Sequence, residues 1–280
     1  MVISSITALT GLGFAASILL AAASKIFFVE EDPRIAKVLG ALPGANCGGC
    51  GYAGCEGYAT AVATDPNIPP NLCVAGGAKV SIAVGELTGK TASESEPLCT
   101  HRRCEKVAGQ VNVRYQYEGM PSCAAAASLA HGADECKYSC LGYGDCVEVC
   151  PFQALRIVDH MVSVNVQLCT GCGKCTHACP REVLQLIPKR ARVAISCSSR
   201  DKLKAVMDVC KIGCIHCGKC VKNCPANAIS MVNDRIQIDH KKCLSYGPDC
   251  DQKCASSCPR HILTVICPNA IEFGKEKQSS

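Results

Sequence analysis

The stretch that decides the fold is CTGCGKCTHACP, from Cys169 to Pro180. Its cysteines follow the spacing Cx2Cx2Cx3C and a proline comes directly after the last. In chains with two iron–sulfur clusters, the first three cysteines of such a run bind one cluster and the fourth binds the other. A second copy, CIHCGKCVKNCP, runs from Cys214 to Pro225. The sequence therefore predicts clusters in pairs, at two places along the chain.

Each run needs a companion, and the sequence supplies one for each. CKYSCLGYGDCVEVCP begins at Cys136, and CLSYGPDCDQKCASSCP begins at Cys243. Their spacings, Cx3Cx5Cx3CP and Cx6Cx3Cx3CP, are looser than the bacterial ferredoxin run. The same number of residues separates Cys150 from Cys169 as separates Cys224 from Cys243. This repetition indicates a duplication, and it predicts two ferredoxin-like modules in tandem.

The segments that connect the paired runs are also alike. ALRIVDHMVSV and AISMVNDRIQI are short apolar stretches that alternate about a polar break. This pattern is typical of a β-hairpin. We therefore expect one hairpin in each module, over residues 154–164 and 228–238.

Cross-ligation within each module predicts four [4Fe–4S] clusters. A lone CxxC pair is also compatible with zinc, which takes four thiolates, but the repeated triplets followed by CP favour iron–sulfur. The predicted ligand sets are Cys136, Cys140 and Cys146 with Cys179; Cys169, Cys172 and Cys175 with Cys150; Cys214, Cys217 and Cys220 with Cys258; and Cys243, Cys250 and Cys254 with Cys224.

A different cysteine pattern precedes these modules. Cys47, Cys50, Cys55 and Cys73 follow the spacing Cx2Cx4Cx17C in a glycine-rich segment. Glycine lets backbone N–H groups approach a metal centre closely. The spacing alone leaves both zinc and an iron–sulfur cluster open. We expect a helix over residues 56–64.

The segment CGGCGYAGCEGYA resembles the small iron–sulfur domain of the RnfB family, whose members are subunits of the Rnf membrane complexes. The similarity continues in CLGYGDCVEVCPFQAL and CTGCGKCTHACPREVL, and the order of parts covers nearly the whole chain. The resemblance implies a [4Fe–4S] cluster at Cys47, Cys50, Cys55 and Cys73. It also implies an ion-pumping complex in which this chain accepts electrons from soluble ferredoxin. Partner subunits in the membrane and others that bind NAD⁺ or flavin then complete the reaction. The second ferredoxin pair departs from simple RnfB forms and indicates an extended one.

The expected fold is α+β, in four parts. These are a transmembrane anchor at residues 1–28, a small helical cysteine-rich domain at 29–92, a first ferredoxin-like module at 93–196 and a second at 197–280. The anchor is expected because Val2 to Ser24 carries no charge and is long enough for a membrane-spanning helix. A cleaved signal peptide is the alternative, although no positive region precedes the segment. Lys25 and Arg34 follow it, so the positive-inside bias favours a single-pass protein of the inner membrane with its bulk in the cytoplasm.

Six cysteines remain outside these sets. Cys99, Cys123, Cys197 and Cys210 are candidates for a sixth cluster, because the insertion with Cys197 and Cys210 can fold back beside residues 99–123. The alternative is that they are inert buried thiols. Cys104 is an alternative to Cys99; otherwise Cys104 and Cys267 are expected to be free. The sequence thus predicts five clusters, or six.

Composition excludes several other classes of protein. The chain has 280 residues, 26 cysteines, no tryptophan and a net charge of +5. It is too long for a small disulfide scaffold, and no basic run interleaved with aromatics indicates nucleic acid. No nucleotide- or haem-binding motif indicates a catalytic pocket. Two alternatives to an Rnf subunit stay open: a redox module of another enzyme, such as a hydrogenase or a reductive activase, and a zinc-rich scaffold.

Overall fold

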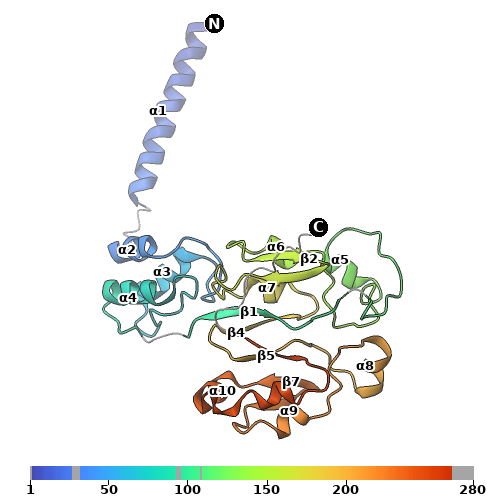
Figure 1. Cartoon of the computed structure of the whole chain (residues 1–280). Helices are drawn as coiled ribbons and strands as arrows, with labels where there is room; N and C mark the ends of the chain where they lie inside the picture. The colour runs from blue at the N-terminus through green and yellow to red at the C-terminus, as the bar shows by residue number, and fades with distance from the viewer. Residues whose placement is uncertain (1, 27–31, 93–95, 108, 267–280) are drawn as a thin grey trace, which may run out of the picture.

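The computed structural model describes residues 2–26, 32–92, 96–107 and 109–266. The helices are α1 (Val2–Ile26), α2 (Pro33–Ala41), α3 (Cys55–Thr64), α4 (Gly77–Thr88), α5 (Cys123–Ser128), α6 (Asp145–Glu148), α7 (Lys174–Ala178), α8 (Leu203–Val209), α9 (Lys219–Lys222), α10 (His240–Tyr246), the 3₁₀ helix η1 (Pro248–Cys250) and α11 (Lys253–Ser256). The strands are β1 (Leu98–Arg102), β2 (Leu155–Val158), β3 (Met161–Val164), β4 (Leu184–Pro188), β5 (Val193–Ile195), β6 (Ile229–Val232), β7 (Arg235–Ile238) and β8 (Leu263–Val265). Figure 1 shows a small helical domain beside one β-containing module, with a second such module below it.

The small domain is formed by α2, α3 and α4. Val38, Tyr58, Val62 and Val84 are almost fully buried between these helices. The ammonium group of Lys90 donates hydrogen bonds to the backbone carbonyls of Val62, Asp65 and Ile68, at 2.7, 2.6 and 2.8 Å. The carbonyls at the end of a helix lack partners within the helix, so a cation there satisfies and stabilises them. The helix expected over residues 56–64 is confirmed as α3.

Each ferredoxin-like module contains two antiparallel strand pairs. In the first module β1 pairs with β4 and β2 pairs with β3, and in the second β5 pairs with β8 and β6 pairs with β7. The β2–β3 and β6–β7 pairs are tight hairpins, with Val158 opposite Met161 and Val232 opposite Arg235. The two hairpins expected from the sequence are therefore confirmed. An outer pair of strands, distant in sequence, brings the two ends of each module together.

Both modules carry an insertion directly after their first strand. Residues 103–135 follow β1 and residues 196–213 follow β5, and the two insertions lie against each other. Cys104 pairs with Cys197 in an antiparallel bridge, and Val111 pairs with Cys210 in another. The backbone N–H of Lys211 donates to the carbonyl of Gln110 at 2.9 Å. The modules are thus joined by backbone pairing between segments that are far apart in sequence.

The expected membrane-spanning helix was wrong. In the part of the chain that the structure describes, no helix is both long enough and apolar enough to cross a membrane. Helix α1 does form, and Leu12, Phe14 and Leu20 are among its exposed apolar side chains. Serine, threonine and glycine interrupt the segment, and the hydroxyls of Thr10 and Ser17 donate to carbonyls one turn earlier. A single-pass location is therefore not supported.

Candidate metal centres

Every cysteine in the described part of the chain is a free thiol, and Cys267 lies outside the described residues. Within that part, no three side chains of His, Cys, Asp or Glu converge closely enough to hold a single metal ion. A [4Fe–4S] cluster needs a different arrangement, because each of four thiolates binds a different iron atom and the sulfurs surround a space. The relevant question is which cysteines surround a common space.

Site 1 lies in the small domain and contains Cys47, Cys50, Cys55 and Cys73. Burial raises the pKa of the Cys73 thiol, and the neighbouring thiolates of the other three raise it further. The side chain of Asn46 accepts a hydrogen bond from the backbone N–H of Cys55 at 2.8 Å, at the start of α3. A partly buried cysteine is thereby fixed at a helix N-terminus, where the helix dipole favours a thiolate.

Site 2 lies in the first module and contains Cys150, Cys169, Cys172 and Cys175. Burial raises the pKa of Cys175 to about 11, and the thiolates of the other three cysteines raise it as well. The buried Thr100 on β1 contacts two of these sulfurs. Its backbone N–H donates to Cys169 Sγ at 3.3 Å, and its hydroxyl lies 3.3 Å from Cys175 Sγ. Hydrogen bonds to ligand sulfurs are one way in which a protein sets a cluster's reduction potential.

Cys99, on the same strand as Thr100, is 4% exposed and packs in a buried apolar group that also contains Cys169 of site 2. Burial raises its pKa to about 11, with Cys169 as the nearest thiolate to contribute. The structure places it beside site 2 and away from Cys197 and Cys210.

Site 3 differs from the sequence prediction by one cysteine. Its pocket is lined by Cys123, Cys140, Cys146 and Cys179 and encloses about 370 Å³ of empty space, open solvent included. Cys136, the expected fourth residue, does not line it. The carboxylate of Asp145 accepts hydrogen bonds from the backbone N–H groups of Cys123 and Ala124, at 2.7 and 2.9 Å. These bonds hold the start of α5 against α6, so that Cys123 faces the pocket.

Two further sites, numbered 5 and 6, lie in the second module and contain the expected residues; site 4, between the modules, is described below. The site 5 pocket encloses about 310 Å³ and the site 6 pocket about 420 Å³, open solvent included in both. Cys217, in site 5, is exposed, and the other described cysteines are buried or partly buried. Site 5 is lined by Cys214, Cys217, Cys220 and Cys258, and site 6 by Cys224, Cys243, Cys250 and Cys254.

The remaining cysteines meet between the modules. Cys197 and Cys210 line one pocket together with Cys104 and Cys136, which we call site 4. The insertion therefore does fold back toward the first module, where it meets Cys104, the alternative to Cys99, and Cys136 in place of Cys123. The spacing puts Cys136 in a ferredoxin-like run and leaves Cys123 outside every run.

Several buried polar groups at these sites have no hydrogen-bond partner within the described chain. Arg181 at site 3 is 8% exposed, and its Nε and Nη1 atoms are unpartnered. Both ring nitrogens of His216, between Cys214 and Cys217, are also unpartnered, as is the hydroxyl of Thr170 beside Cys169. Buried donors need acceptors. The sulfides and thiolates of an iron–sulfur cluster supply acceptors, so these residues fit such a group.

The small domain lies directly against site 2. A Cβ atom on Gly49, between Cys47 and Cys50, would come within 2.9 Å of the Cys172 carbonyl oxygen. The thiolate of Cys47 also contributes to raising the pKa of Cys172, after burial. Sites 1 and 2 are therefore immediate neighbours across a domain boundary.

Comparisons with known proteins find three iron–sulfur parts in this chain, and the first dicluster match spans Cys136 but not Cys123. Residues 42–75 match a family described as a putative Fe–S cluster, and residues 134–184 and 213–262 each match a 4Fe–4S dicluster domain. These matches support [4Fe–4S] clusters in this chain and leave their number open.

Three curated relatives are similar over nearly the whole chain, and each is the RnfB-type component of its complex. The relative from the proton-translocating ferredoxin:NAD(+) oxidoreductase complex of Clostridium ljungdahlii is 40% identical over 95% of this chain and 93% of its own length. The one from an ion-translocating oxidoreductase complex of Methanosarcina acetivorans is 41% identical over 95% of this chain and 98% of its own. The one from the Na(+)-translocating ferredoxin:NAD(+) oxidoreductase complex of Acetobacterium woodii is 36% identical over 91% of this chain and 74% of its own length.

Proposed function

Because the chain belongs to the RnfB family of ion-translocating oxidoreductase (Rnf) complexes, we propose that it accepts electrons from reduced ferredoxin and relays them to partner subunits. It is an iron–sulfur electron-transfer subunit and acts as the redox relay of an oxidoreductase complex. A redox module of a hydrogenase or an activase is disfavoured, because the similarity extends over the small domain and both modules together.

The ligands proposed for five [4Fe–4S] clusters are the cysteines of sites 1, 2, 3, 5 and 6. When bound, each cluster supplies one-electron oxidation and reduction. The chain holds the ligands, excludes water and adjusts the potentials through hydrogen bonds and buried charge. Thr100 does this at site 2 and Arg181 at site 3. The contact of Gly49 with Cys172 is the observation that carries the relay, because electron transfer requires neighbouring centres and this contact joins two domains.

Ferredoxin docks at site 5 in this proposal. Cys217 is exposed there, and Lys219 and Lys222 lie exposed on the adjacent α9. An exposed ligand brings a redox centre to the surface, and complementary charge mainly raises the association rate of an acidic donor. The basic run at His101 to Arg103 offers no such surface, because Arg103 is 3% exposed.

The partners proposed are the other subunits of the complex, those in the membrane and those that bind NAD⁺ or flavin. The bulk of the chain lies on the cytoplasmic side of the inner membrane, held there by the complex, where soluble ferredoxin is available. No nucleic acid is expected to bind.

The docking surface can be tested by charge reversal. In the variant Lys219→Glu/Lys222→Glu, the rate of electron transfer from reduced ferredoxin falls about tenfold or more at low salt, and the difference shrinks as salt screens the charges. Stopped-flow bleaching of the iron–sulfur absorption measures it. The matched control is Lys37→Glu/Lys79→Glu, which makes the same charge change on exposed residues of the small domain. If the control slows transfer and the α9 variant does not, ferredoxin docks at the small domain instead.

A further inference from the structure

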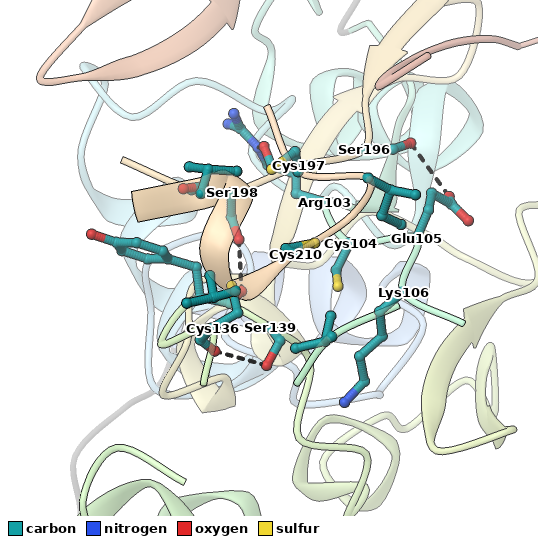
Figure 2. A pocket seen from close by; sticks show the side chains of 17 residues that line it. Arg103, Cys104, Glu105, Lys106, Cys136, Ser139, Ser196, Cys197, Ser198 and Cys210 are labelled. Atoms are coloured by element: carbon teal, nitrogen blue, oxygen red, sulfur yellow. Dashed lines mark hydrogen bonds between the residues drawn. The ribbon is translucent and has the colours of Figure 1, made fainter. Parts of the chain in front are cut away.

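The pocket at site 4 is built from four separate segments of the chain. Figure 2 shows Cys104 and Cys136, from the first module's side, and Cys197 and Cys210, from the second module's insertion, around one space. The pocket encloses about 440 Å³, open solvent included, against about 420 Å³ at site 6. Four cysteines thus surround a space of the same size as a site predicted independently from ferredoxin spacing.

Backbone pairing fixes three of the four cysteines. Cys104 is bridged to Cys197, and Cys210 is bridged to Val111. Next to Cys136, the Ser139 hydroxyl donates to the Cys136 carbonyl at 2.9 Å and to the Asp134 carboxylate at 2.5 Å. The bridges join segments distant in sequence, so the convergence is a property of the fold.

Charge at site 4 suits a group that binds thiolates. The four cysteines line the pocket together with Arg103. The guanidinium of Arg103 is buried beside them and donates from Nε to the Cys197 carbonyl at 3.3 Å. A buried cation offsets part of the negative charge that four thiolates bring.

No ferredoxin site is left incomplete by this arrangement. Cys136 is available for site 4 because Cys123 takes the fourth position at site 3. Cys123, Cys140, Cys146 and Cys179 line the site 3 pocket together. The described cysteines therefore form six sets of four, and Cys99 is left over among them.

We propose that Cys104, Cys136, Cys197 and Cys210 bind a sixth [4Fe–4S] cluster that links the two ferredoxin-like modules. On one side, Cys104 packs against the buried apolar cluster that contains Cys140 of site 3. On the other, the backbone N–H of Cys214 in site 5 donates to Cys197 Sγ at 3.3 Å. Site 4 thus touches one site of each module.

One electron passes per step, so that one centre is oxidised as its neighbour is reduced and no bond is made or broken. The inference rests on the proposed relay function and supplies the connection that a relay through both modules needs.

The test is a count of iron, acid-labile sulfide and zinc in the full chain, purified without oxygen. The wild-type chain should contain about 24 iron and 24 sulfide atoms, four of each per cluster. Cys197→Ser/Cys210→Ser should contain about 20 of each, and so should Cys104→Ser/Cys136→Ser, which removes the same cluster from the other module. The matched control, Cys99→Ser, changes a buried cysteine outside the sets and should keep about 24.

About 20 iron atoms in the wild type, unchanged in both double variants, would overturn the proposal. One zinc atom per chain that disappears in both double variants would also overturn it. If the iron content of one double variant alone falls well below about 20 atoms per chain, that variant is misfolded. The iron content of the other double variant then tests the proposal. If the sixth cluster does not exist but the proposed function is right, the wild-type chain contains about 20 iron atoms, and ferredoxin still reduces its clusters. Failure of the proposed function instead leaves the iron in place and unreduced by ferredoxin, so the two results are distinguishable.

The linking role has its own readout. After mixing with reduced ferredoxin, rapid freezing and EPR follow reduction of site 1 and site 5 separately, with the signals assigned from site variants. In both double variants, reduction of site 5 should keep its wild-type rate, and reduction of site 1 should slow at least tenfold. Equal rates at site 1 in the wild type and both variants would show that electrons bypass site 4.

Discussion

The backbone of Gly49 lies so close to Cys172 that a single added carbon would come within 2.9 Å of the Cys172 carbonyl oxygen. This contact is where the small domain meets the first module, and Cys47 and Cys50 of site 1 lie on either side of it in sequence. A larger side chain at this position requires the backbone around Gly49 or Cys172 to shift.

The first prediction concerns that contact. Gly49→Ala should lower the apparent Tm, at a cost of about 1–3 kcal/mol for overpacking against backbone. It should also slow electron transfer between sites 1 and 2 while the iron content stays unchanged. Gly40→Ala is the matched control, because a Cβ there meets no atom within 4 Å. Equal rates of electron transfer between sites 1 and 2 in Gly49→Ala and the wild type would show that electrons do not pass through this contact.

The second prediction concerns Lys90 in the small domain. Lys90→Met removes three hydrogen bonds to carbonyls near the end of α3, of which the Asp65 carbonyl keeps only a bond from the Ile68 N–H at 3.3 Å. We expect the free energy of unfolding of this domain to fall by about 2–3 kcal/mol, since hydrogen bonds to charged groups are the stronger ones. Limited proteolysis between residues 32 and 92 measures the loss. Lys79→Met, an exposed residue on α4, should stay within about 0.5 kcal/mol of the wild type.

The third prediction concerns the buried charge of Arg103. Its guanidinium donates to Gln185 Oε1 at 2.9 Å in the first module and to the Ile236 carbonyl at 2.8 Å in the second. Burial lowers its pKa to about 10, so it stays protonated at neutral pH. Arg103→Gln should lower the reduction potential of the nearest cluster by on the order of 50 mV, for one charge acting at an effective dielectric constant near 20.

A redox titration followed by EPR measures this shift. Arg103→Lys keeps the charge and should restore most of the potential, although it loses the hydrogen bonds. Arg190→Gln, which changes an exposed arginine paired with Glu96, should leave all potentials unchanged. Equal potentials in Arg103→Gln and Arg103→Lys would mean that hydrogen bonds, and not charge, set the value.

The fourth prediction concerns pH and His101. Burial lowers its pKa to about 4, the charges of Arg102 and Arg103 and of His240 lower it further, and a hydrogen bond with the backbone of Ile195 opposes them. The folded chain then binds fewer protons than the unfolded chain between about pH 6.5 and 4, so stability falls as pH falls through that window. From about pH 7.5 to 5.5 the loss should be about 1 kcal/mol. Tm profiles of the wild type and His101→Gln measure it, and parallel profiles would contradict the assignment.

The sequence predicts local structure well, for physical reasons, and the ligand sets remain a prediction. Hairpins such as β2–β3 and β6–β7 depend on alternation over a few residues, and a ferredoxin run carries its ligand spacing within a short segment. Site 4 has no such signal, because its cysteines come from four segments that meet only after the insertions pair. The position of Cys123 depends on Asp145 holding the start of α5, a contact that no spacing encodes. The anchor prediction is contradicted, because no helix in the described part of the chain is long and apolar enough to cross a membrane.

The central claim is that this chain takes electrons from ferredoxin into iron–sulfur centres. The most direct measurement is an anaerobic titration of the full chain with reduced ferredoxin, followed by the iron–sulfur absorption and compared with a titration by dithionite. The account predicts bleaching by ferredoxin to the extent of about five or six electrons per chain, one for each cluster. Bleaching by dithionite with none by ferredoxin, or a chain that carries zinc and no iron, would contradict it.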